Sequence, residues 1–177
     1  MRLFVAIELP KSFRAEAARL GAALRAESRE GRFVPQQNYH ITLHFIGESQ
    51  NLAGAAAAME EAVRGIRPFG LHLGHMDSFP RNEGHTAYLQ VLGELSELNA
   101  LYESLQSALA ERGFPRPQKR FTPHVTLGRG IVLPEEALER LRSEPVNASM
   151  QVPGIALFES RRQESGVTYL PLHRASF

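Results

Sequence analysis

Two short motifs of the same form could place acid–base groups side by side. Each holds a histidine, an aliphatic residue, a threonine and a leucine, and they begin 84 residues apart: His40-Ile41-Thr42-Leu43 and His124-Val125-Thr126-Leu127. With 7 His and 5 Thr in the chain, two His-x-Thr pairs arise by accident on the order of 1–2% of the time. Because imidazole titrates at about 6.5, one histidine can accept a proton while another donates one at neutral pH.

The spacing inside each motif indicates that its histidine and threonine point the same way. Both motifs lie in segments typical of β-strands, where residues i and i+2 share a face. The aliphatic residues then point to the opposite face, into a core. If the two strands face each other across a cleft, two imidazoles and two hydroxyls can surround one substrate, and the hydroxyls can donate hydrogen bonds to anionic oxygens. This arrangement suits phosphoryl transfer without a metal.

The charge around both motifs favours an anionic substrate. No carboxylate lies between Glu30 and Glu48, or between Glu111 and Glu135. The second of these windows also carries five basic side chains: Arg112, Arg116, Lys119, Arg120 and Arg129. A phosphate would be attracted to both stretches. The net charge of +1, by contrast, argues against bulk, non-specific binding of nucleic acid.

Length and composition limit the class of protein. A chain of 177 residues is long enough for one domain and short for two, since domains hold about 100–200 residues each. The absence of cysteine excludes disulfides, thiol nucleophiles and iron–sulfur clusters. The apolar run at 3–7 is too short for a signal peptide, and no run is long enough to cross a membrane. We therefore expect a cytoplasmic protein that does not bind membranes.

Apolar periodicity predicts an α+β fold. Strands are expected at 2–9, 39–46, 68–78, 85–92, 121–129, 149–159 and 165–172, and helices at 13–29, 51–66, 94–112 and 134–142. Ser12 is expected to cap the first helix and Gly31 to end it. The order strand, helix, strand, strand recurs in each half. This predicts one bilobal domain over 1–177, with two pseudo-symmetric lobes, each a mainly antiparallel sheet with helices on its outer face, and a cleft between the sheets.

The sequence resembles the two-histidine (2H) phosphoesterase superfamily, and more narrowly the RNA 2′,3′-cyclic phosphodiesterases, first described as 2′-5′ RNA ligases. The resemblance runs through nearly the whole chain. Three blocks carry it: 2–10 (RLFVAIELP), 34–47 (VPQQNYHITLHFIG) and 121–129 (FTPHVTLGR). Family members often carry tryptophan directly before the Val34-Pro35 step, where this chain has Phe33.

That resemblance implies an enzyme that hydrolyses a terminal RNA 2′,3′-cyclic phosphate to a 2′-phosphomonoester with no metal or other cofactor. His40 would protonate the departing O3′ as general acid, and His124 would activate water as general base. Thr42 and Thr126 would hold the phosphate oxygens, and Arg129 matches a family arginine that contacts the phosphate. The reverse reaction, with a 5′-OH RNA end in place of water, would give weak 2′-5′ ligation.

Two candidate substrate-binding residues do not fit simple strand alternation. Phe45 and Arg129 each stand five positions after their histidine, an odd offset that would point them away from the site. Gly128 could permit a bulge that returns Arg129. Phe45 has no adjacent glycine, so packing in the core and stacking on a substrate base are both open for it.

The other histidines are not expected to act in catalysis. His44 shares the predicted face of His40, but the two lie about 13 Å apart on a strand, which is too far for one metal. We expect His44 at the edge of the cleft or exposed. Four more are expected on a sheet surface or have no assigned role: His72, His75, His85 and His173.

Two other functions remain open on the residues alone. A non-catalytic module could bind a nucleotide or an RNA end in the same cleft. An enzyme of the same design could act on 2′-5′ oligonucleotides or small cyclic nucleotides. We expect a monomer whose partner is RNA with a 2′,3′-cyclic phosphate end or a small nucleotide.

Overall fold

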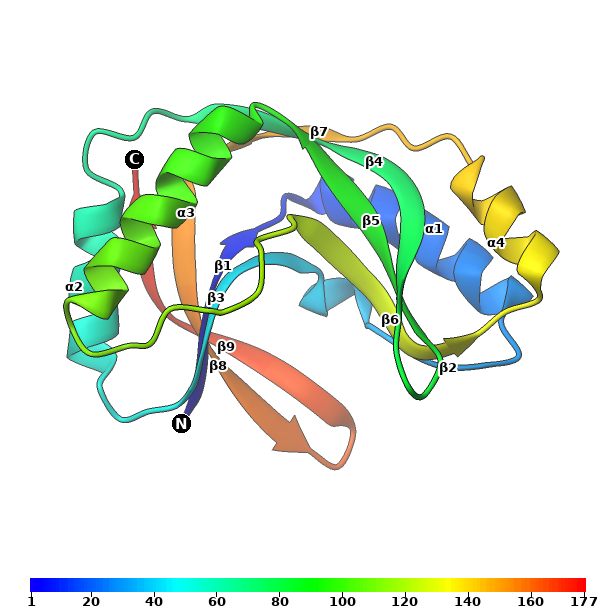
Figure 1. Cartoon of the computed structure of the whole chain (residues 1–177), viewed down its shortest axis with the longest axis horizontal. Coiled ribbons are helices and arrows are strands. Elements are labelled where there is room, and N and C mark those ends of the chain that lie inside the picture. The colour runs from blue at the N-terminus through cyan, green and yellow to red at the C-terminus, as the bar shows by residue number, and fades with distance from the viewer.

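Nine strands and four α-helices make up the protein, and its computed structural model describes all residues from 1 to 177 (Figure 1). The strands are β1 (Arg2–Glu8), β2 (Glu30–Phe33), β3 (His40–Glu48), β4 (Phe69–Pro80), β5 (His85–Gly93), β6 (His124–Val132), β7 (Ser149–Val152), β8 (Gly154–Gln163) and β9 (Gly166–Ser176). The helices are α1 (Lys11–Glu27), α2 (Leu52–Ala62), α3 (Leu95–Ala110) and α4 (Glu135–Arg142).

The strands form two antiparallel sheets, each covered by a pair of helices. The first sheet has the order β3-β1-β8-β9 and the second the order β2-β6-β5-β4-β7. Helices α2 and α3 pack together beside the first sheet, and α1 and α4 pack on the second at β6 and β4 (Figure 1). We call the first sheet with α2 and α3 the first lobe, and the second sheet with α1 and α4 the second lobe. The predicted α+β fold with two lobes is confirmed.

The chain crosses between the lobes in a way that the predicted repeat did not contain. Apart from the short strands β2 and β7 and the last strand β9, two units of the form β-α-β-α-β follow one another: β1-α1-β3-α2-β4 and β5-α3-β6-α4-β8. In each unit the last strand leaves its own sheet and pairs with the first strand of the other unit, β4 with β5 and β8 with β1. Helix α3 thus follows β5 in the second unit as α1 follows β1 in the first. Each sheet combines strands from both halves of the sequence.

Three local predictions were wrong. Helix α1 begins at Lys11 because the Pro10 carbonyl accepts the first helical hydrogen bond, from the Arg14 amide, so Ser12 lies inside the helix and does not cap it. The helix ends at Glu27, before Gly31, which instead belongs to β2. Strand β2 was missed because its four residues are mostly exposed and show no apolar alternation.

The predicted strand at 149–159 is in fact two strands that belong to different sheets. Pro153 has no amide hydrogen to donate to a ladder, and the pairing stops there. The segment before it, β7, joins the second sheet, and β8 after it joins the first. This short connection carries the chain back from the second lobe to the first.

One apolar core of 38 buried residues extends through both lobes. It includes the aliphatic residues that the two motifs were predicted to bury: Ile41, Leu43, Val125 and Leu127, each no more than 3% exposed. Both histidine-bearing strands are thus anchored from beneath by the same core. No helix of the protein combines the length and the apolar character needed to cross a membrane.

Candidate active site

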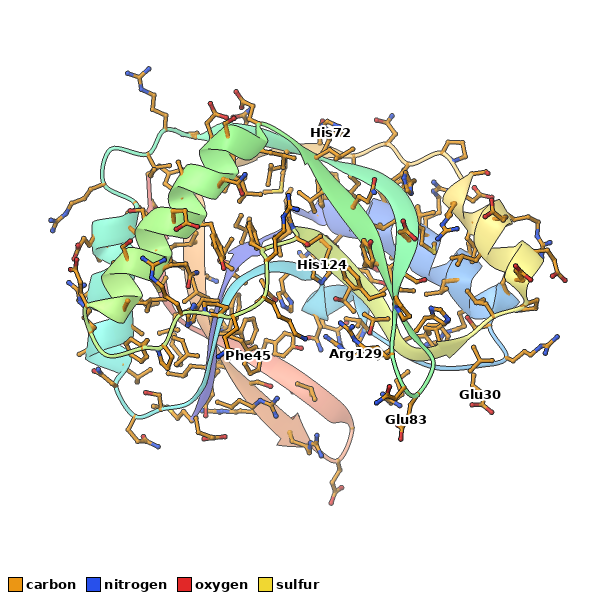
Figure 2. All side chains as sticks on the ribbon, viewed as in Figure 1. Glu30, Phe45, His72, Glu83, His124 and Arg129 are labelled. Carbon is orange, nitrogen blue, oxygen red and sulfur yellow. The ribbon has the colours of Figure 1, made fainter.

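The two motif histidines open two neighbouring strands of different sheets. His40 is the first residue of β3, at the edge of the first sheet, and His124 is the first residue of β6 in the second. Strands β3 and β6 contact each other where the two lobes meet. In Figure 2, His124 lies in this region, and Phe45 of the first lobe lies to its lower left. We call the group His40, Thr42, His124 and Thr126 the interlobe site.

Both imidazoles are held by the same backbone contact. His40 Nδ1 lies 2.7 Å from the carbonyl oxygen of Asn38, and His124 Nδ1 lies 2.6 Å from that of Thr122. A carbonyl oxygen can only accept, so each Nδ1 carries a hydrogen and donates it. This leaves Nε2 of each ring as the atom that can gain or lose a proton.

The motif threonines lie on the same strand faces as their histidines. Thr42 Oγ1 is 2.8 Å from His40 Nε2, so its hydroxyl can donate to the neutral ring or accept from the protonated one. Thr126 lines the same pocket as His124. The predicted sharing of a face by residues i and i+2 is therefore found in both strands.

A β-bulge at the same point of each motif reverses the alternation that follows it. In β3, Thr42 pairs with Ala6 and His44 pairs with the adjacent Val5, so that Leu43 has no partner. Strand β3 therefore has one more residue than β1 over this stretch, which is the extra residue of a bulge. The side chain after the bulge, Phe45, returns to the face of the interlobe site, where it is 53% exposed. Core packing of Phe45, one of the two readings left open, is wrong.

The bulge in β6 has the same position and the same effect. Thr126 pairs with Tyr88 and Gly128 with the adjacent Ala87, which leaves Leu127 unpaired. Arg129 therefore joins the face of His124 and Thr126, and it lines their pocket. Figure 2 shows Arg129 between the two lobes. The two bulges explain how Phe45 and Arg129, at an odd offset of five residues from their histidines, reach the face of the site. The bulge in β3 forms without a glycine.

The bulge in β3 also corrects the prediction for His44. This side chain is 3% exposed and faces the core, not the cleft edge or solvent. Its Nδ1 donates to Oε1 of Gln106 on α3 at 2.6 Å. Burial lowers the pKa of His44, so the ring is neutral at neutral pH, and the hydrogen bond to Gln106 opposes that shift only in part.

Replacing Gln106 by leucine is expected to destabilise the fold. The buried Nδ1–H of His44 would lose its acceptor, and an unpaired buried donor costs about 1–3 kcal/mol. Urea denaturation followed by circular dichroism should show this loss in the free energy of unfolding. The exposed Gln118→Leu variant is the control. An unchanged unfolding free energy for Gln106→Leu would show that the hydrogen bond does not hold α3 against β3.

Aromatic rings surround each catalytic candidate, and sequence reasoning did not identify them as part of the site. The centroids of Phe4 and Tyr169 lie 4.9 and 5.3 Å from that of His40. Those of Phe79 and Tyr88 both lie 5.4 Å from His124. Phe4 had been predicted only as part of a buried strand. Phe79 on β4 and Tyr169 on β9 join the site through the crossing between lobes, whereas Tyr88 lies on β5, the sheet neighbour of β6. No local signal in the sequence marks any of the three.

The two sides of the interlobe site differ in chemistry. The first lobe has an aromatic cluster, in which the buried Phe4 stacks on the exposed Phe45 at 6.2 Å and on the buried Phe158 at 5.3 Å. The pocket next to His40 adds two amide side chains, Gln37 and Asn38, and one side chain of each charge, Glu8 and Arg14. On the second lobe the pocket next to His124 is basic instead. It contains three arginines: Arg32, Arg81 and Arg129.

Most of the basic residues expected to attract a phosphate do not reach the site. Arg112 pairs with Glu61 and Arg116 with Glu103. Lys119 and Arg120 line a separate pocket along α3, which includes neither His40 nor His124. Of that window only Arg129 lines the His124 pocket. The other two arginines there, Arg32 and Arg81, were not singled out from the sequence.

Burial and positive charge lower the pKa of both histidines. For His40 the main cause is burial, and the charges of Arg129 and His124 add to it. For His124 the main cause is again burial, followed by Arg129 and Arg81. The hydrogen bonds to the Asn38 and Thr122 carbonyls oppose these shifts without cancelling them. Both rings are therefore neutral at neutral pH, and a nearby anion would favour their protonation.

The site offers no set of ligands for a metal ion. No group of three or more His, Asp or Glu side chains in the protein is close enough to hold one. The groups that converge are two imidazoles, two hydroxyls and a guanidinium. They can exchange protons and bind the oxygens of an anion.

Comparison with known proteins gives a consistent picture. The family model described as the 2′-5′ RNA ligase superfamily matches residues 9–164. The RNA 2′,3′-cyclic phosphodiesterase of Thermotoga maritima is 26% identical over 182 residues, covering 100% of this chain and 96% of that protein. The protein of the same name from Aeropyrum pernix is 32% identical over 149 residues, covering 79% of this chain and 82% of its own.

Solved structures match over nearly the whole chain. TT0787 of Thermus thermophilus has a TM-score of 0.79 at 27% identity, covering 99% of this chain and 97% of that one. Escherichia coli LigT in complex with 3′-AMP also has a TM-score of 0.79, at 28% identity and with the same coverage. The bilobal arrangement is therefore shared with both.

Proposed function

This chain belongs to the 2′-5′ RNA ligase superfamily, and we propose that it hydrolyses the 2′,3′-cyclic phosphate at an RNA end to a 2′-phosphomonoester. Relatives named RNA 2′,3′-cyclic phosphodiesterase support the reaction. The observation that carries the proposal is the pair of matched His-Thr units, one from each lobe, with each Nδ1 fixed by a carbonyl and each Nε2 left for proton exchange.

The difference between the two lobes suggests how the substrate lies. A terminal base would stack on Phe45 of the first lobe, which is exposed beside the buried Phe4. The ribose attached to that base then places O3′ next to His40. The opposite face of the phosphorus, from which water attacks in line, faces His124.

In the proposed reaction His124 takes up one proton and His40 gives up another. His124 Nε2 takes a proton from water as the water oxygen bonds to phosphorus. The bond from phosphorus to O3′ breaks, and His40 Nε2 donates its proton to O3′. The phosphate stays on O2′. Thr42, Thr126 and Arg129 would hold its non-bridging oxygens, with the guanidinium offering paired donors to the phosphate.

The substrate itself would set the protonation state that this reaction needs. In the free protein burial, and after it the charges of Arg129 and His124, hold the pKa of His40 down. A bound phosphodiester anion offsets those charges and favours an imidazolium next to O3′. Both histidines are supplied by one chain, so we propose that a monomer, acting as one bilobal domain, is sufficient.

The pH dependence should reflect these lowered pKa values. Catalysis needs one protonated and one neutral histidine, so kcat/KM is expected to follow a bell whose centre lies below 6.5, the ordinary pKa of histidine. Arg129→Gln removes a charge that lowers both pKa values, so the bell should move to higher pH. The control is Arg64→Gln, which replaces an exposed arginine just after α2. A bell of equal position in Arg129→Gln would contradict this account of the site.

The product identifies the reaction. The protein should be incubated in EDTA with an RNA that ends in a 2′,3′-cyclic phosphate, and the product examined by phosphorus NMR. A 2′-phosphate supports the proposal. A 3′-phosphate would mean that O2′ departs and that the orientation is reversed. Binding without turnover would favour the non-catalytic module.

A further inference from the structure

The two matched His-Thr units differ in what holds the residue behind each histidine. Each imidazole donates to the carbonyl two residues before it, which belongs to Asn38 in one unit and to Thr122 in the other. Asn38 is 6% exposed, and its side chain makes a hydrogen bond to a distant strand. Thr122 is exposed, and its side chain makes no hydrogen bond. At this position only the unit of the proposed acid is tied to another part of the fold.

We propose that Asn38 is a positioning residue for the general acid, because its side chain joins the β8–β9 hairpin to the carbonyl that orients His40. Asn38 itself transfers no proton and acts through the imidazole. The inference rests on the proposed function, and it adds to that function a residue that governs how the proton reaches O3′.

Three polar groups of Asn38 have fixed partners. The residue ends the 3₁₀ turn Gln36–Asn38, where its amide donates to the Pro35 carbonyl at 2.9 Å. Its own carbonyl accepts from His40 Nδ1 at 2.7 Å. Its Nδ2 donates to the carbonyl of Val167 on β9 at 2.8 Å, and since a carbonyl can only accept, the side-chain nitrogen must face β9. A displacement of residue 38 would therefore strain all three hydrogen bonds.

The β8–β9 hairpin projects beyond the rest of the first sheet (Figure 1). Strand β1 pairs with β8 only as far as Ser160, so the outer part of the hairpin at 161–168 has no third strand beside it. The hydrogen bond from Asn38 is the one that joins this outer part to a residue outside the hairpin. Next along β9, the Tyr169 ring packs edge-on against His40, with centroids 5.3 Å apart. The hairpin and the acid are thus fastened together at Asn38.

The proposed reaction leaves His40 dependent on this attachment. In the free protein the ring is held at both nitrogens, by the Asn38 carbonyl at Nδ1 and by the Thr42 hydroxyl at Nε2. During the reaction Nε2 must turn its proton to O3′, and Thr42 would hold the phosphate. The contact at Nδ1 then remains as the hydrogen bond that fixes the ring. Misplacement of a catalytic group by about 1 Å can cost on the order of 10²-fold in rate.

The test compares two 2′,3′-cyclic substrates, one with oxygen and one with sulfur at the 3′ position. Departure of O3′ needs the acid, whereas a thiol titrates at about 8.5 and leaves as a thiolate without one. Asn38→Ala is expected to lower kcat/KM on the oxygen substrate by about 10–10²-fold. Activity on the sulfur substrate should change little, so the ratio of sulfur to oxygen kcat/KM rises by the same factor. Because the readout is a ratio, a smaller folded fraction of the variant cancels.

Two further variants support the comparison. Gln36→Ala is the control, since Gln36 is exposed on the same turn and its side chain makes no hydrogen bond. It should keep the wild-type ratio. Asn38→Ser removes less of the buried side chain and retains a hydroxyl donor, so it should give an intermediate ratio, and it serves as the test if Asn38→Ala does not fold. In a His40→Ala background, Asn38→Ala should cause no further loss on the oxygen substrate, because no acid remains to be positioned.

The outcomes separate this inference from the proposed function. Equal losses on both substrates would overturn it, since Asn38 would then act on the fold or on substrate binding alone. Unchanged activity on both substrates would overturn it as well. A wild-type protein that does not hydrolyse the oxygen substrate would instead overturn the proposed function.

Discussion

Replacement of His124 by alanine is expected to lower kcat/KM for a 2′,3′-cyclic mononucleotide by about 10²–10⁴-fold, the usual size of general-base catalysis. The Nδ1–H of this ring is committed to the Thr122 carbonyl, so Nε2 is its one basic atom, and alanine leaves no substitute on the second lobe. Steady-state kinetics at the pH optimum of the wild-type protein measure the effect.

The matched control is His72→Ala. His72 is exposed on β4 and lies far from the interlobe site (Figure 2). Its kcat/KM should equal that of the wild type. Thermal melting should confirm that both variants fold, since neither removes a core side chain. Turnover by His124→Ala at a rate near that of His72→Ala would contradict its role as the base.

Replacement of His40 by alanine is expected to cause a loss of similar size, with a different dependence on the leaving group. The proposed acid protonates O3′, which is a poor leaving group as an alkoxide. A thiol titrates at about 8.5 and departs as a thiolate without a proton donor. A cyclic substrate with sulfur in place of O3′ should therefore restore most of the activity of His40→Ala, and none of that of His124→Ala.

This comparison assigns the two roles separately. Restored activity in His124→Ala but not in His40→Ala would mean that His124 is the acid and His40 is the base. Equal losses on both substrates would mean that His40 acts by holding Thr42 or the phosphate, through the contact of 2.8 Å between Nε2 and the hydroxyl, and not by protonating O3′. His72→Ala again serves as the control on both substrates.

Several features were predictable because they depend on local spacing. The period of two along a strand put His40 and Thr42 on one face and Ile41 and Leu43 in the core, and the same holds around His124. The apolar stripe of the first helix is fully buried as its spacing predicts: Phe13, Ala17, Leu20 and Leu24. Such patterns are fixed by the geometry of one element.

Other features depend on contacts between distant segments. The bulges that return Phe45 and Arg129 to the site arise from the pairing of β3 with β1 and of β6 with β5, and a bulge without glycine leaves no signal in the sequence of β3. The burial of His44 follows from the same bulge. The ion pairs of Arg112 with Glu61 and of Arg116 with Glu103 also depend on how α3 packs. The sequence alone could not show that these two arginines are neutralised.

The sequence by itself determined the chemistry of this protein: two imidazole–hydroxyl pairs, no thiol, and local freedom from carboxylates around both motifs. The tertiary structure decided where that chemistry is applied. Because each unit gives its last strand to the other sheet, Phe79 of β4 reaches His124, and Phe158 of β8 reaches the Phe4 ring beside His40, each from a strand remote in sequence. Strand exchange between lobes is selected by the burial of a shared core, a property of the whole chain that no local pattern contains.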